Sequence, residues 1–153
     1  MSIEQDVATL RKIPLFAGID KIKLKLLAFT SQRLTYAAGQ ELFHQGDDGD
    51  AAYVIIEGEG EVLVDTDDGP VRLAVVAKNS IVGEIAILCD VPRTATIRAS
   101  TSLLTLRIEK KQFVELITKF PELAIEIMRV LGDRLTASNQ ELTRMRAALR
   151  DQA

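Results

Sequence analysis

The stretch GEIAILCDVPRTAT, residues 83–96, places a carboxylate at Glu84 and a guanidinium at Arg93 at opposite ends of a short apolar segment headed by Gly83. GEIAIL has poor turn chemistry for a hairpin and is short enough to form one or two helical turns. The first turn of a helix has backbone N–H groups without intrahelical partners at the positive end of its dipole, which favours anions. The stretch therefore predicts a short helix that begins at an anion site.

The residue types around this helix start indicate which anion is bound. Gly83 lets the backbone approach a ligand closely, and Arg93, just after Pro92, offers a planar fork suited to two phosphate oxygens. Glu84 cannot contact a phosphate favourably, so we expect it to meet a hydroxyl donor on the same ligand, as a ribose would offer. A sugar phosphate satisfies both ends. A lone Glu/Arg pair is usually a structural ion pair, but the glycine, Ala86 and the PRTAT frame favour ligand binding.

Around this stretch, residues 32–108 have the pattern of short strands. The runs YVII, EVLV, RLAVVA, TATIRA and LLTLRI are alternating or continuous apolar segments bounded by Gly, Asp or Pro, and DTDDGP is typical of a hairpin tip. Several such strands at regular spacing indicate a sandwich or a jelly-roll barrel. We expect turns at Gly39, Gly46, Gly58 and Gly69.

Helical patterns flank the strands on both sides. Residues 1–31 carry apolar positions at mixed helical spacings, interrupted by Pro14, which predicts two or three short helices. Residues 109–150 are helical in pattern, and Pro121 can begin a second helix there. The prediction is a single α+β domain over residues 1–153, mainly β: a jelly-roll β-barrel flanked by N-terminal helices and a long C-terminal helix.

Composition excludes several classes of protein. A chain of 153 residues with 47% apolar residues is long enough for one domain that buries roughly 68–70% of its unfolded surface. The net charge of −3 gives no electrostatic footprint for nucleic acid. No apolar run approaches the roughly 18 residues that cross a bilayer, and the start MSIEQDVATLRK lacks the apolar core of a signal peptide. With one cysteine and no internal disulfide, we expect a cytoplasmic protein without a membrane partner.

Few residues suit a metal centre or a catalytic site. His44 is the only histidine, which argues against a metal centre built from several imidazoles. Asp47, Asp48 and Asp50 lack the distal bidentate glutamate of a calcium loop, and turn chemistry explains them better. Cys89 is expected to be a small buried or half-buried side chain. No nucleophile with a general base is visible, so we expect no metal, no cofactor and no enzymatic activity.

The quoted stretch carries a resemblance to a known family. GEIAIL followed by PRTAT closely resembles the phosphate-binding cassette of cyclic-nucleotide-binding domains, which occur in the catabolite activator protein, protein kinase A regulatory subunits and cyclic-nucleotide-gated channels. IPLFAGI, YAAGQELFHQGDDGD and YVIIEGEGEV look like the family's entry helix, first glycine turn and central strands. The resemblance implies that the ligand is cAMP or cGMP.

The same resemblance implies roles for the cassette residues. Glu84 would accept the ribose 2′-hydroxyl, and Arg93 would pair with the cyclic phosphate. Backbone N–H groups near Ala86 and Ala95 would complete the phosphate cradle. The implied ligand-binding residues of the cassette are Gly83, Glu84, Ile85, Ala86, Arg93, Thr94 and Ala95.

The implied base site involves residues further away. Val62 and Leu73 would line the base pocket. Thr94 resembles the threonine that reaches the guanine amino group in cGMP-dependent kinases and channels, but some cAMP-responsive members also have threonine there. We expect cAMP, with cGMP as the alternative. Val82 stands where the family often has Phe, which affects packing more than chemistry.

A stripe of apolar residues along the predicted C-terminal helix has spacings of 3 and 4, the a/d pattern of a coiled coil. The pattern favours a homodimer, although a lone helix folded back on the barrel would show a similar stripe over fewer turns. Gly132 would mark a bend or a close approach of helices. The stripe consists of Met128, Leu131, Leu135, Ser138, Leu142, Met145 and Leu149.

In the family resemblance this helix also covers the base, so Arg134, Ser138 and Asn139 are expected near the ligand. Binding would then reposition or order the helix from about Glu122 onward and pass the change to a downstream protein partner. The resulting prediction is a cyclic-nucleotide sensor module.

Other function classes fit the sequence less well. A transcription factor of this family would need a helix-turn-helix after the long helix, and the chain stops at Ala153, so that class requires a fragment. A channel or kinase regulator likewise requires a fragment of a larger protein. A degenerate member that senses another ligand should have lost Glu84 or Arg93, and both are present.

Overall fold

The computed structural model describes residues 3–13 and 16–151, so the predicted break at Pro14 lies outside the described residues. The described helices are α1 (Ile3–Arg11), α2 (Lys21–Thr30), α3 (Glu84–Leu88), α4 (Lys110–Lys119) and α5 (Pro121–Asp151). The described strands are β1 (Gln32–Tyr36), β2 (Glu41–Phe43), β3 (Ala51–Glu57), β4 (Gly60–Thr66), β5 (Gly69–Val76), β6 (Ile81–Val82), β7 (Thr96–Ala99) and β8 (Leu103–Glu109).

The strands form two four-stranded antiparallel sheets, with orders β1-β8-β3-β6 and β2-β7-β4-β5. Side chains from both sheets share one buried cluster, so the sheets pack face to face. Within the described residues no backbone pairing joins them, so the strands of the predicted jelly-roll β-barrel are observed as two sheets that do not close into one. The combination of antiparallel sheets and helices confirms the predicted α+β class. The predicted hairpin tip at DTDDGP is also confirmed, because it joins β4 to β5.

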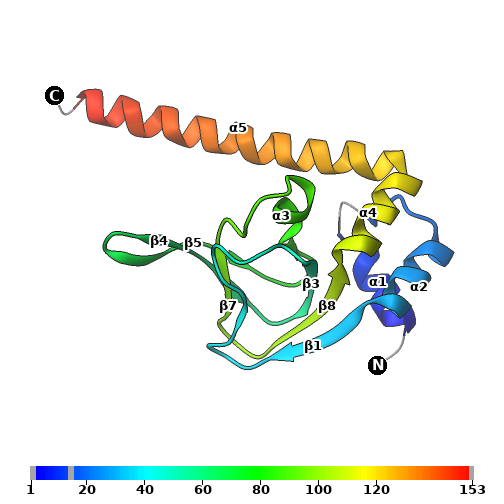
Figure 1. Cartoon of the computed structure of the whole chain (residues 1–153). Helices are drawn as coiled ribbons and strands as arrows, with labels where there is room; N and C mark the ends of the chain where they lie inside the picture. The colour runs from blue at the N-terminus through cyan, green and yellow to red at the C-terminus, as the bar shows by residue number, and fades with distance from the viewer. Residues whose placement is uncertain (1–2, 14–15, 152–153) are drawn as a thin grey trace.

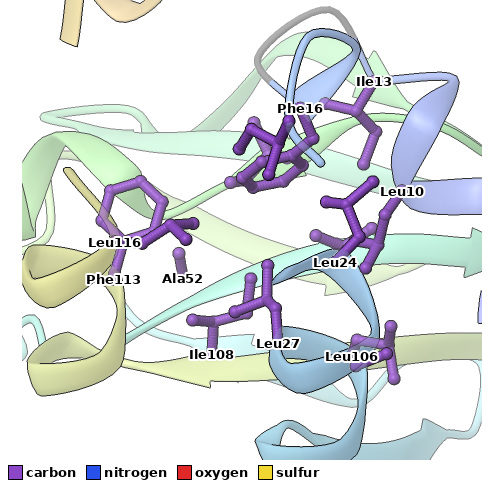
Figure 2. Packing of buried hydrophobic residues seen from close by; sticks show 14 of the residues in the cluster. Leu10, Ile13, Phe16, Leu24, Leu27, Ala52, Leu106, Ile108, Phe113 and Leu116 are labelled. Atoms are coloured by element: carbon purple, nitrogen blue, oxygen red, sulfur yellow. The ribbon is translucent and has the colours of Figure 1, made fainter. Parts of the chain in front are cut away.

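Strand β3 is buried on both faces. Its alternate side chains point to opposite sides, and each side is covered by another part of the fold. One set faces the second sheet, where Ala51, Tyr53 and Ile55 join its cluster. The other set faces the helices (Figure 2), where it meets apolar side chains of α1, α2 and α4. That second cluster includes Leu10, Leu24, Leu27, Ala52, Val54, Ile56, Leu106, Ile108, Phe113 and Leu116.

Helices α2, α4 and α5 begin at residues with recognisable capping chemistry, and the predicted helix start at Pro121 is confirmed. The N-terminal region forms two helices, and the side chain of Asp20 accepts a hydrogen bond from the Ile22 N–H at the start of α2. Glu109 and Gln112 form a capping box at the start of α4. Pro121 is the first residue of α5, where its missing N–H costs no helical hydrogen bond.

Helix α5 runs past α3 and continues toward the side of the molecule where the β4–β5 hairpin projects (Figure 1). Only its first turns pack on the domain, with Leu123 and Ile127 buried. From Gly132 onward the described residues are exposed. The alternative of a helix folded back along the sheets is therefore not observed over this part of the stripe.

Cys89 differs from its prediction, because the structure leaves it exposed. It caps the C-terminus of α3, and the next residue, Asp90, has a φ of 51°. At this position, past the last turn of α3, the cysteine side chain lies in solvent rather than in a core.

Candidate functional site

A cavity of about 540 Å³ lies between the quoted stretch, the second sheet and α5. This volume falls within the roughly 300–1,000 Å³ of small-molecule sites. One wall is formed by residues 83–86 and 93–95, and the opposite wall by Val62 and residues 74–76. Val130 and Arg134 of α5 also line the cavity. The described fold thus brings the sequence-predicted cassette to one concave site.

Gly83 connects β6 to α3 and sits at the N-cap of that helix with a φ of 83°. A Cβ built at this position would lie 2.6 Å from Nη1 of Arg93 and 3.2 Å from the carbonyl oxygen of Ala51. Both the backbone conformation and the close approach of the arginine therefore require glycine. The predicted short helix at GEIAIL is confirmed as α3.

The guanidinium of Arg93 is buried, with only 3% of the residue exposed. Its Nη1 donates to the carbonyl of Gly83 at 2.8 Å, and its Nη2 donates to the carbonyl of Ala51 at 2.6 Å. The guanidinium carbon also lies 4.0 Å from the centre of the Phe43 ring. Burial lowers the pKa of Arg93 from its ordinary value, but an arginine side chain stays protonated in proteins. A fixed positive charge therefore stands in the cavity wall.

The Nε atom of Arg93 has no hydrogen-bond partner. Among the described residues, it and Oδ1 of Asn79 are the buried side-chain atoms left in this state, and both residues line the cavity. A buried donor without a partner is destabilising by roughly 1–3 kcal/mol. Asn79 could not be recognised from the sequence, because its only local feature is a left-handed turn that asparagine tolerates, with a φ of 71°.

Asp50 links Arg93 to the start of α4, which the sequence analysis missed. Its carboxylate accepts from Nη2 of Arg93 at 3.4 Å and from Nη2 of Arg107 at 3.1 Å. Its backbone carbonyl accepts from the N–H of Lys110 at 3.0 Å. Turn chemistry explains Asp47, which accepts the His44 N–H at 3.0 Å, but Asp50 makes long-range ion pairs that its local sequence does not reveal.

Glu84 is buried at the first position of α3, and its Oε1 accepts from Nη1 of Arg134 at 2.9 Å. The ion pairs of the described residues join Glu84 to Arg134 and Arg93 to Asp50, and no pair joins Glu84 to Arg93. The simple structural pair weighed in the sequence analysis is therefore not formed. Instead, the carboxylate ties α3 to α5 at the edge of the cavity.

The remaining predicted site residues divide into two groups. Ile85, Thr94, Ala95 and Val62 line the cavity with the residues described above. Leu73, Ser138 and Asn139 are not among the described lining residues.

The position of Leu73 has a clear structural reason. Val62 pairs with Ala74, whereas Leu63 pairs with Arg72, so Leu73 is the extra residue of a β-bulge. Leu73 is 66% exposed, whereas Ala74 and Val76 line the cavity, because successive side chains of a strand point to opposite faces. The resemblance, rather than a strand pattern, had implied a role for Leu73.

Comparison with known proteins now identifies the family. The profile described as "Cyclic nucleotide-binding domain" matches residues 33–120, which include both sheets' central strands and the whole cavity-lining cassette. The chain belongs to this family. The predicted resemblance is thus confirmed, and the cyclic nucleotide-binding domain occupies most of the chain.

Relatives of this cyclic nucleotide-binding domain occur in several kinds of protein. The chain is similar to the cAMP-dependent protein kinase regulatory subunit of Blastocladiella emersonii, with 32% identity over 111 residues, covering 72% of this chain and 28% of that subunit. The chain therefore spans only part of the length of this relative.

Solved structures give the same fold. The N-terminal domain of a transcriptional regulator from Streptomyces coelicolor is 35% identical, with a TM-score of 0.68, and the match covers 86% of this chain and 95% of that one. The catabolite activator protein of Thermus thermophilus is 27% identical, with a TM-score of 0.78, over 86% of this chain and 62% of that protein.

The described residues contain no cluster of three or more histidine, cysteine or acidic residues arranged to hold a metal ion. Among the described helices, none combines the length and hydropathy needed to cross a bilayer.

Proposed function

We propose that this domain binds a purine cyclic nucleotide, preferentially cAMP, in the cavity beside α3, and acts as a sensor without catalysing a reaction. The observation that carries the proposal is that a buried guanidinium, Arg93, and a buried carboxylate, Glu84, line one wall of the same cavity. A ligand that presents an anion and a hydroxyl a few ångströms apart satisfies both groups. A ribose cyclic phosphate has this arrangement.

Each part of the ligand then has a place. The cyclic phosphate lies at the start of α3, where the N–H groups near Ala86 and Ala95 and the guanidinium of Arg93 provide donors. The ribose 2′-hydroxyl donates to Glu84. The base lies against the apolar wall of Val62 and residues 74–76, and Leu73 contacts it only if β5 rearranges.

We further propose that Arg134 couples the ligand to α5. Its guanidinium already bonds the carboxylate that would receive the ribose hydroxyl. A ligand that also contacts this carboxylate, or displaces Arg134 from it, would bind the protein with different affinities in different positions of α5. A relay requires such a difference in affinity. Ser138 lies four residues, and Asn139 five residues, beyond Arg134, so they reach the base only if α5 moves relative to α3.

The choice of cAMP over cGMP rests on the name of the Blastocladiella relative, a cAMP-dependent kinase subunit, whereas Thr94 is the residue that favours the alternative, cGMP. The Thr94 side chain is exposed at the cavity and offers one hydroxyl hydrogen bond, worth about 1 kcal/mol. Thr94→Ala should selectively lower cGMP affinity by about fivefold. Equal loss for both nucleotides, or none, would show that the threonine does not read the base.

The deciding experiment is isothermal titration of the chain with cAMP and with cGMP. We expect saturable binding at one site, and a loss of about 30- to 1000-fold in Arg93→Ala, equivalent to roughly 2–4 kcal/mol of charge-assisted bonding. Arg72→Ala serves as the matched control, because Arg72 is an exposed arginine that pairs with Glu61. Unchanged affinity in folded Arg93→Ala would remove the site assignment.

A further inference from the structure

Helix α2 carries an apolar stripe on its outer surface. Ile22, Leu26 and Phe29 are 75%, 63% and 73% exposed, respectively. We call these three residues the α2 stripe. At 100° per residue they fall within an arc of about 60°, opposite Leu24 and Leu27, which the helix buries against the sheet. An apolar face directed away from the core has no role in the packing of this domain.

Lysines border the α2 stripe on both sides. By the same helical geometry, Lys21 and Lys25 lie along one edge and Lys23 along the other. In the described part of the chain, none of the three takes part in an ion pair, and Lys23 lies 4.0 Å above the Phe120 ring. The surrounding acidic groups are few: Asp20 caps the helix, and Glu4 lines the shallow hollow beside the α2 stripe.

We propose that the α2 stripe binds the surface of a membrane that contains anionic lipids. Apolar side chains bordered by lysines match the boundary between lipid headgroups and acyl chains, because the lysine stems follow the apolar surface while the ammonium groups reach the phosphates. Ile3 of α1 extends the apolar surface at the same hollow. The expected absence of a membrane partner rested on the lack of a spanning segment, which has no bearing on binding at the surface.

An acidic protein segment is the main competing occupant, and the geometry favours lipid. A partner helix usually inserts its anchors into an apolar groove, whereas the α2 stripe occupies the outward ridge of a helix that lies at the edge of the molecule (Figure 1). A second copy of this chain is also a poor match, because the exposed end of α5 carries Arg144, Arg146 and Arg150 and would repel the lysines.

The test is flotation of the chain with vesicles of phosphatidylcholine alone and of phosphatidylcholine mixed with phosphatidylglycerol, at low and high salt. We expect binding to the mixed vesicles that weakens with salt. Lys21→Gln with Lys25→Gln should reduce binding about 10- to 30-fold. Lys111→Gln with Lys119→Gln is the control of equal charge, on exposed positions of α4.

A second pair of variants tests the apolar contribution. Ile22→Ser with Phe29→Ser should abolish flotation, whereas Val114→Ser with Ile125→Ser, at exposed positions of α4 and α5, should leave it unchanged. All four positions are exposed, so folding should persist, and circular dichroism checks it. If the chain does not bind the mixed vesicles, the proposal is overturned. This is the result expected if the α2 stripe instead binds an acidic protein segment. Equal losses in the test and control variants would also overturn it, because binding would then depend on overall charge or hydropathy alone.

Discussion

Arg93 supports the fold and the proposed site at the same time. Its donors hold the carbonyls of Gly83 and Ala51, and its charge stands in the wall of the cavity. The sequence could indicate its ligand role from the spacing to Glu84, because both residues lie in one short segment. It could not indicate the structural role, because Ala51 is far away in the chain.

The double role predicts that Arg93→Ala destabilises the ligand-free protein as well as weakening binding. Two buried carbonyls would lose their donor, which is expected to lower the free energy of unfolding by about 2–4 kcal/mol. Urea unfolding without nucleotide measures this, with Arg72→Ala as the control. If the two variants unfold at the same urea concentration, the bonds in the core contribute nothing to stability.

Glu84→Gln should weaken the proposed contact with the ribose hydroxyl while leaving the fold intact. The amide keeps the size of the side chain but accepts the 2′-hydroxyl less strongly, so the preference for cAMP over 2′-deoxy-cAMP should shrink by about three- to tenfold. Titration of both ligands into both proteins forms a double-mutant cycle. A wild-type protein that binds both ligands equally would contradict the role of Glu84.

At the scale of elements, the sequence located the strands, α3, α4 and the start of α5 because each has a local pattern and clear punctuation. The resemblance placed Leu73 in the cavity, where the structure puts the neighbouring Ala74 instead. The sequence also could not show that Asp50 reaches Arg107, because that contact depends on how strands far apart in the chain pair.

The bond between Glu84 and Arg134 predicts how α5 behaves. Arg134→Ala should raise hydrogen exchange in residues 122–150 of the ligand-free protein by about fivefold, since a partly exposed ion pair is worth about 1 kcal/mol. Arg129→Ala is the control, because Arg129 pairs with Glu126 on the same helix without touching the cavity. Nucleotide should change protection of the same residues in wild type. An unchanged pattern with nucleotide would exclude the relay.

At the scale of the whole molecule, the outer part of α5 presents an apolar seam without a partner. Leu135, Leu142, Met145 and Leu149 are each about half exposed or more, and a Cβ at Gly132 would meet no described atom within 4 Å. The heptad spacing therefore still predicts a homodimer through α5.

Sedimentation of the chain tests this dimer. Leu142→Asp should shift it to monomer, because a carboxylate in the seam would be buried without a partner. Ala147→Asp places the same charge on the other side of the helix and should leave the dimer intact. A chain ending near Thr136 should also be monomeric. A full-length chain that sediments as a monomer at high concentration would remove the coiled-coil interpretation.

The arrangement around Arg93 also has a consequence for the entropy of ligand capture. A long side chain usually loses about 0.5–1.5 kcal/mol of rotamer freedom when a ligand fixes it. Two backbone carbonyls and the Phe43 ring have already fixed this guanidinium in the ligand-free protein. That entropy was lost on folding, so an arriving anion would meet a charge that is already in place.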